Sequence, residues 1–423
     1  MRPLAPPLLA PRTPPLALRN VMNGGLRSLL AIAGVGFSIT LVLLQLGFLE
    51  AVRVTATTVY DQLDFDVVLV SPQYEQFFGP GSFPKVRLEE AGSEEWVIEA
   101  VPFYALMSLW RCPPYPVGSP RDLPRTGEEE EIGAFRRWFL GERRPRPLQI
   151  RELLVLGIDP EHNPFRDPIR TQVEVARPKL LNRDRVLLNE WSSLDFGWQA
   201  RGEFSDWELN GRRVEVVGGF TLQRSFGADA SVLCSDENFA RALRLPGVGQ
   251  VNFGLLKVRP GMVPEVVRRL GQRLPPDVQV LSRDELVARE EDYWVRQTAT
   301  GNIFEYGVLI TILVAAVVIY QVLSNDIRDH ITEYATLKAM GHTNAFLSRI
   351  VMTQAVIYSL SAYFPAVVAG WILYRATEAL ANIPMRMTPV NLGRVLLLTV
   401  GASLVSGLLT LRKVRSADPA YLF

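Results

Sequence analysis

The sequence has little of the chemistry on which most enzymes and metal sites depend. Its 423 residues include two cysteines and three histidines. Two cysteines are too few for a disulfide framework or a zinc site, and His162, His330 and His342 have no ligand spacing to one another. The net charge of +1, from 45 Lys and Arg against 44 Asp and Glu, gives no support to nucleic acid as a partner. Disulfide-scaffold, zinc-binding and nucleic-acid-binding classes are therefore excluded.

Motifs for phosphate binding and hydrolysis are missing as well. The chain contains no G-x-x-x-x-G-K-[ST] phosphate loop, no H-E-x-x-H motif and no G-x-S-x-G motif. Gly34 and Gly36 lie inside an apolar run rather than between a strand and a helix, so they form no dinucleotide motif. The sequence predicts a chain that is not an enzyme and that holds no cofactor, metal or catalytic residue.

Charge is nearly absent from four long apolar runs, at 29–49, 303–323, 350–374 and 395–411. A helix needs about 20 mostly apolar residues to cross a bilayer, and core helices of soluble domains rarely lack a polar face over such a length. We therefore predict four transmembrane helices. Intramembrane charges usually mark ion or polar-substrate pathways, and only Glu305 comes near one, so an ion-coupled transporter is disfavoured.

The charges before the first run set the predicted orientation. Arg2, Arg12, Arg19 and Arg27 precede it, and the first acidic residue is Glu50, which places the N-terminus in the cytoplasm. The first run is longer than a signal-peptide core and is interpreted as an uncleaved anchor. Outside the four runs, the predicted segments are a cytoplasmic tail 1–28, a periplasmic domain 50–302, a cytoplasmic loop 324–349, a short periplasmic loop 375–394 and a cytoplasmic tail 412–423.

The predicted fold class is an α-helical membrane protein in a 1+3 arrangement with an inserted α+β extracytoplasmic domain. Residues 50–62 are expected to extend the first span as a stalk helix, and strands are expected at 64–71 and at 97–110, the latter broken at Pro102. Asn210-Gly211 predicts a hairpin because both residues tolerate positive φ. From residue 231 onward, alternating strand and helix patterns predict a separate compact α/β subdomain.

Three further features of the 50–302 segment are open to interpretation. The Pro-rich and acidic stretch 113–149 predicts a mobile surface insertion. Cys112 and Cys234 are either a disulfide or two buried thiols, since the compartment permits both. Ser282 and Glu285 form a capping box from which we expect a continuous helix into the second span, the alternative being a break at Gly301-Asn302.

Residues 333–340 predict a short helix with charged residues, ended by Gly341, whose missing Cβ suits the position after a helix C-terminus. The surrounding segment NDIRDHITEYATLKAMGHTNAFLSRI (325–350) resembles the coupling segment of MacB/FtsX-type ABC transporter permeases. The closing SADPAYLF (416–423) is also similar to that family, as is the 1+3 topology. Within the family the chain looks most like the DevC-like branch, the permease of a glycolipid exporter, in the stretches 66–73, 82–88, 223–239, 251–261, 292–304 and 333–343. The insertion 113–149 and the Pro-rich N-terminal tail depart from it.

The resemblance implies a permease subunit in the bacterial inner membrane whose motion is driven by ATP hydrolysis in a separate ABC ATPase subunit. It also implies a second permease copy, a periplasmic adaptor, an outer-membrane channel and a lipid-like substrate. The alternatives are an FtsX-like regulator of a periplasmic enzyme and a lipoprotein-releasing permease. The residues that the resemblance assigns to ATPase coupling are Arg328, Glu333, Tyr334, Leu337, Lys338, Gly341 and His342.

Overall fold

The computed structural model describes residues 25–111, 150–192, 196, 207–225, 227–243, 249–381 and 384–415. The chain divides into two compact units. The helical unit comprises the chain up to Leu49, Ile303–Ala376 and the chain from Met385, and the sheet unit comprises Glu50–Asn302 with Thr377–Pro384. Predictions for the tail before residue 25, Cys112, the insertion 113–149 and the closing segment 416–423 lie outside the described residues.

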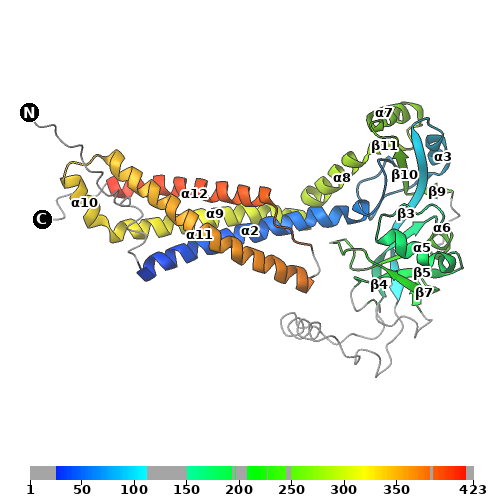
Figure 1. Ribbon diagram of the computed structural model, residues 1–423, viewed down its shortest axis with the longest axis horizontal. Helices are drawn as coiled ribbons and strands as arrows, with labels where there is room; N and C mark the ends of the chain where they lie inside the picture. Colours follow the sequence, from blue (N-terminus) through cyan, green and yellow to red (C-terminus); the bar gives the residue numbers. More distant parts are fainter. Residues whose placement is uncertain are drawn as a thin grey trace, which may run out of the picture. The chain divides into compact units, whose positions relative to one another are not determined.

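Four long helices, with one short helix at the end of their bundle, make up most of the helical unit (Figure 1). The helices are α2 Gly25–Asp61, α9 Ala299–Asp329, α10 Ile331–Ala339, α11 Asn344–Ala381 and α12 Pro389–Arg415. The four long ones are long and apolar enough to cross a membrane. Hydroxyl groups link them, since Ser406 donates to the Ala316 carbonyl at 3.0 Å and Thr40 to the Ala366 carbonyl at 3.4 Å. Such bonds are suited to a bundle that lacks water.

The sheet unit is built on one nine-stranded sheet in the order β11-β1-β10-β3-β4-β8-β5-β7-β6. The strands are β1 Val67–Val70, β3 Val97–Arg111, β4 Ile150–Ile158, β5 Arg185–Asn189, β6 Trp207–Leu209, β7 Arg212–Phe220, β8 Ser231–Ser235, β10 Phe253–Val258 and β11 Gln279–Ser282. A two-stranded sheet pairs β2 Phe83–Pro84 with β9 Gln250–Val251. The helices are α3 Val86–Gly92, α5 Ile169–Leu180, α6 Asp236–Ala242, α7 Val263–Arg273 and α8 Arg283–Asp292.

The long strand β3 joins two parts of this sheet. Its first half pairs with β10, and its last residues, Trp110 and Arg111, pair with β6, which closes the strands β3-β4-β8-β5-β7-β6 into a ring. Alternate residues enter opposite cores, Tyr104 and Trp110 on one side and Phe103 and Ala105 on the other. Trp110 packs against Trp207 with ring centroids 5.4 Å apart.

Several local predictions are confirmed. Asn210 and Gly211 have φ of 52° and 75° and connect β6 to β7 as a tight hairpin. Ser282 with Glu285 forms the capping box of α8. The stalk prediction also holds, because α2 continues as one helix to Asp61.

Two predictions about the sheet are wrong. Pro102 does not interrupt β3, because it pairs with Gly254 of β10 and lies just before Phe103, where pairing with β4 begins. Its missing N–H therefore removes no bond to β4. The strands after residue 230 do not form a separate subdomain either, since β3 and β4 lie between β8 and β10 in a single sheet.

The predicted continuous helix from α8 into the second span is also wrong. After α8 comes a π-helical turn, η4 Tyr293–Gln297, and Thr298 then has an extended backbone with φ −96° and ψ 151°. The Thr298 hydroxyl accepts a hydrogen bond from Gly301 N at 3.1 Å and so begins α9 as an N-cap. The break precedes the predicted alternative at Gly301-Asn302 because the threonine cap, rather than the glycine, starts the new helix.

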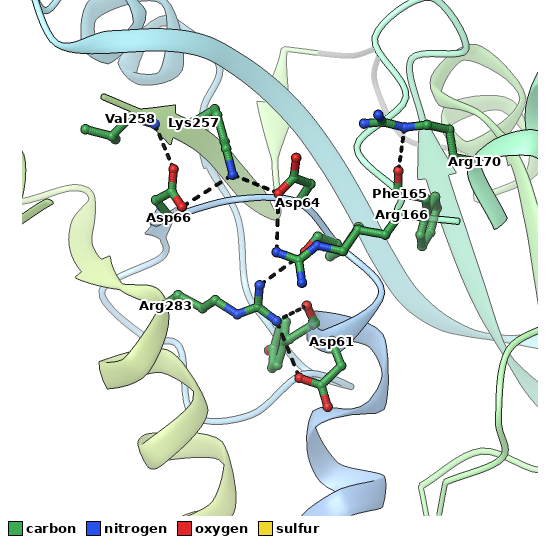
Figure 2. Close-up of polar contacts among 11 residues, drawn as sticks. Asp61, Asp64, Asp66, Phe165, Arg166, Arg170, Lys257, Val258 and Arg283 are labelled. Atoms are coloured by element: carbon green, nitrogen blue, oxygen red, sulfur yellow. Dashed lines mark hydrogen bonds and ion pairs between the residues drawn. The ribbon is translucent and has the colours of Figure 1, made fainter. Parts of the chain in front are cut away.

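The end of α2 is held firmly within the sheet unit (Figure 2). Arg283, the first residue of α8, donates through Nη2 to the Tyr60 carbonyl at 3.1 Å and to Asp61 Oδ1 at 3.4 Å. A cation is favourable at a helix C-terminus, where carbonyl groups lack helical partners. Nearby, Lys257 Nζ lies 2.8 Å from Asp64 Oδ1, and hydrogen bonding to Lys257 lowers the pKa of Asp64. The last turn of α2 and the first turn of α8 are thus fixed to each other.

Candidate coupling surface on the helical unit

The predicted coupling residues lie on and around α10, a short helix between two transmembrane helices. Figure 1 shows it at one end of the four-helix bundle. Only His330 separates α9 from α10, and its ring Nδ1 contacts the Asp326 carbonyl at 2.9 Å. Because the connection is this short, a displacement of α10 acts directly on the end of α9.

The other end of α10 is fixed by Gly341. Its φ of +89° is a conformation that residues with a side chain rarely adopt. Gly341 N donates to the Lys338 carbonyl and His342 N to the Leu337 carbonyl, both at 3.1 Å. This is the Schellman pattern, which satisfies the last carbonyls of a helix. It turns the chain into α11 and places the His342 ring on Phe346, with centroids 4.4 Å apart and planes at 17°.

Two of the predicted coupling residues face the interior of the helical unit. Tyr334 is 1% exposed, and its hydroxyl donates to Gln354 Oε1 of α11 at 2.9 Å. Burial raises the pKa of Tyr334, so the hydroxyl keeps its proton and remains a donor. Leu337 is half-buried and packs in a cluster with Ile327, Leu347 and Val351. In this arrangement both residues hold α10 in place, and Tyr334 presents no surface to a partner.

The remaining predicted residues lie nearer the surface. Arg328, Glu333, Gly341 and His342 are exposed, and Lys338 is half-buried. We call the exposed set Arg328, Glu333, Met340, His342 and Phe346 the α10 surface. It combines charges of both signs with apolar and aromatic side chains, a composition that suits the docking of another protein.

Met340 and Phe346 are absent from the sequence-based set of coupling residues. Met340 is 64% exposed and Phe346 is 41% exposed, so both offer apolar surface that a partner could bury. The signal for Met340 was its place beside Gly341, seven residues after Glu333 and so about two turns further along the same helical face. Phe346 gave no local signal, because its exposure depends on how α11 begins. Among the described residues, no group of three His, Cys, Asp or Glu is placed to hold a metal ion.

The helices and the sheet unit together define the class: a multi-pass membrane protein with a large extracytoplasmic domain. Residues 307–419, which include the whole α10 surface, match the sequence family described as FtsX-like permease C-terminal. Over these residues the chain is similar to ABC transporter permeases of the MacB/FtsX type. The DevC-like branch stays a prediction.

Two solved structures are similar to the chain at low identity. One is the extracellular domain of the noncanonic ABC-type transporter YknZ from Gram-positive bacteria, with 10% identity, a TM-score of 0.31, and coverage of 52% of this chain and 100% of that chain. The other is the periplasmic region of MacB from Actinobacillus actinomycetemcomitans, with 10% identity, a TM-score of 0.30, and coverage of 53% and 92%. No curated protein sequence matches the chain.

Proposed function

We propose that the chain is the permease subunit of an ABC exporter and that it transmits ATPase-driven motion to its extracytoplasmic domain. The observation that carries this proposal is the α10 surface. Glu333 is exposed on α10, and the exposed Met340, His342 and Phe346 follow at the turn into α11, where the His342 and Phe346 rings stack. The helix is joined at both ends to transmembrane helices by short connections. A partner that pushes on this surface displaces α9 and α11 together.

A path from the membrane to the sheet unit supports the same proposal. The helix α2 runs without interruption from Gly25 to Asp61, and a continuous helix transmits displacement with little loss. Arg283 holds the end of α2 to the start of α8. The second connection, through η4 and Thr298, contains a π-helical turn and an extended residue, which can bend. In our proposal α2 carries the motion and the segment around Thr298 accommodates it.

The proposed working unit contains two permease copies and two copies of a separate ATPase subunit in the bacterial inner membrane. A periplasmic adaptor and an outer-membrane channel complete a tripartite exporter, and the DevC-like resemblance favours a lipid-like substrate. The nearly charge-free spans support a role in transmitting motion, because they offer no evident polar pathway through the bilayer.

The test is co-purification of the full chain with its ATPase after gentle detergent extraction. Glu333→Lys, Met340→Ala and Phe346→Ala are each expected to reduce the bound ATPase by at least about tenfold, as substitutions at interface hot spots do. Glu174→Lys and Val175→Ala, exposed on α5 of the sheet unit, are matched controls and are expected to leave it unchanged.

The outcomes separate the candidate functions. An ATPase and an adaptor recovered together support the exporter, whereas an ATPase recovered with a cell-wall hydrolase supports the regulatory alternative. If no ATPase is recovered, or if the α10 variants retain it as the controls do, the coupling assignment is refuted.

A further inference from the structure

Two hydrogen bonds connect α9 and α10 to α11 behind the α10 surface. The Tyr358 hydroxyl of α11 donates to Asp326 Oδ1 of α9 at 2.9 Å, and the Tyr334 hydroxyl of α10 donates to Gln354 Oε1 of α11 at 2.9 Å. Gln354 and Tyr358 are four residues apart on one helix and so share a face. The two bonds are therefore successive links from one face of α11, the first to α9 and the second to α10, with the short α9–α10 connection between them.

The same cluster holds two buried polar atoms that these bonds do not use. Within the part of the chain that the structure describes, Asp326 Oδ2 and Gln354 Nε2 have no hydrogen-bond partner. Gln354 is 0% exposed. A carboxylate oxygen accepts and an amide nitrogen donates, so the two unpaired atoms are complementary to each other. Their side chains project from facing helices about one helical turn apart, because Asp326 contacts the residue one turn beyond Gln354.

This pattern is costly for the arrangement seen here. A buried donor or acceptor without a partner loses its bonds to water and gains nothing in return. Packing offsets the cost, since Tyr334 lies in a cluster with Ile327, Leu347, Ile350 and Val351. An arrangement in which α10 moves and the two unpaired atoms meet would regain a hydrogen bond while giving up some of that packing. Two arrangements of similar free energy are what a switching element requires.

We propose a latch with two positions that couples movement of α10 to movement of α11. It is formed by Asp326, Tyr334, Gln354 and Tyr358. In the first position the tyrosines bond to Asp326 and Gln354, as in this structure. In the second position Gln354 Nε2 donates to Asp326 Oδ2 and Tyr334 leaves its place against α11. These are positioning residues, and the latch rests on the proposed function because the ATPase supplies the movement.

An exchange of the amide and the carboxylate tests the second position. Asp326→Asn places two donors opposite each other, and Gln354→Glu places two acceptors there, so each variant alone prevents the pair. The double variant Asp326→Asn/Gln354→Glu restores one donor and one acceptor and keeps an oxygen for each tyrosine. Glu305→Gln, the same chemical change on an exposed residue of α9, is the control.

The first readout is ATP turnover by the ATPase that co-purifies with the full chain. Each single variant is expected to lower permease-dependent turnover by about 5- to 150-fold, the usual range of coupling between two sites, and the double variant is expected to return it to within about 2-fold of the unaltered chain. Glu305→Gln should change nothing. If the double variant is as defective as the product of the two single variants, the two side chains never pair and the proposal is overturned.

The second readout needs no partner. Tyr334→Phe removes only the hydroxyl, and in the full chain in detergent it is expected to speed backbone hydrogen exchange in α10 by about 2- to 10-fold, as the loss of one net hydrogen bond does. Tyr306→Phe, on the exposed side of α9, should leave exchange in α10 unchanged. Unaltered exchange in Tyr334→Phe overturns the latch even if an ATPase binds. Failure to recover an ATPase overturns the proposed function, while this measurement still decides the latch.

Discussion

Glu290 of α8 offers a direct test of what holds the sheet unit together. Its carboxylate is fully buried. Oε1 accepts hydrogen bonds from Phe77 N and Trp294 Nε1, both at 3.0 Å. Oε2 accepts one from the hydroxyl of Tyr74 and one, at 3.4 Å, from that of Tyr60, and these two hydroxyls lie 2.6 Å apart. One carboxylate thus joins α2, the segment after β1, α8 and the π-helical turn.

Two substitutions at this position separate its hydrogen bonds from its charge. Glu290→Ala leaves the N–H groups of Phe77 and Trp294 without an acceptor, whereas the two tyrosines can still bond to each other. The buried Phe77 N–H without a partner is expected to cost about 1–3 kcal/mol in the free energy of unfolding, and the partly buried Trp294 N–H adds a smaller loss. Glu290→Gln keeps an oxygen for both N–H groups, and its amide can donate to a tyrosine oxygen, so we expect a change within about 1 kcal/mol.

The pH dependence follows from the direction of the pKa shift. Burial raises the pKa of Glu290 above its ordinary value, and the hydrogen bonds offset this only in part. The stabilisation from this group is therefore complete below the unfolded pKa and is lost as the pH rises through the folded pKa. Relative to Glu290→Gln, the unaltered chain should gain stability as the pH falls from neutral towards about 4.

The assay is chemical unfolding of the full chain in detergent, followed by tryptophan fluorescence, together with hydrogen exchange at the amide of Phe77. Exchange at this amide should accelerate in Glu290→Ala and not in Glu290→Gln. The reasoning is refuted if the two variants lose the same stability, or if Glu290→Ala leaves exchange at Phe77 unchanged.

Three further predictions test single features of the fold. Gly341→Ala should destabilise the end of α10 by about 1 kcal/mol in thermal unfolding, and Gly341→Asn by less, because Asn tolerates positive φ; equal costs would contradict the backbone explanation. Gly157→Ala should cost about 1–3 kcal/mol, since the new methyl group would lie 2.8 Å from Phe239 Cβ, and an unchanged melting temperature would show that α6 shifts freely. Asp64→Asn should reduce the stability that the chain loses in acid. Hydrogen bonding to Lys257 lowers the pKa of Asp64, so the contribution of Asp64 to the free energy of unfolding disappears as the pH falls through that pKa. An acid titration of unfolding identical to that of the unaltered chain would refute this.

Features that depend on neighbouring residues could be predicted from the sequence. The Asn210-Gly211 hairpin, the Ser282 capping box and the helix end at Gly341 each depend on a few adjacent residues, whose backbone preferences do not need the rest of the chain. The four spans were equally evident, because a long uncharged run has few alternatives to a bilayer. These signals carried the fold class, whereas the coupling segment was located by its resemblance to MacB/FtsX-type permeases.

Features that depend on distant residues could not be predicted. Pro102 is tolerated because pairing with β4 begins at the next residue, and the strands after residue 230 join one sheet because β3 and β4 lie between them. In each case the outcome depends on which partner is present in space, and a pattern along the chain does not contain that information.

The coupling segment shows the same division within a few residues. The sequence by itself determined that a short helix with charged residues lies between two spans and ends at Gly341, because helix boundaries depend on local backbone chemistry. Only the tertiary structure decided that Tyr334 faces inward to Gln354 while Met340 and Phe346 face outward, and that Asp326 meets Tyr358. Which side of a short helix is buried depends on the helices that pack against it, and those contacts form between residues far apart in the chain.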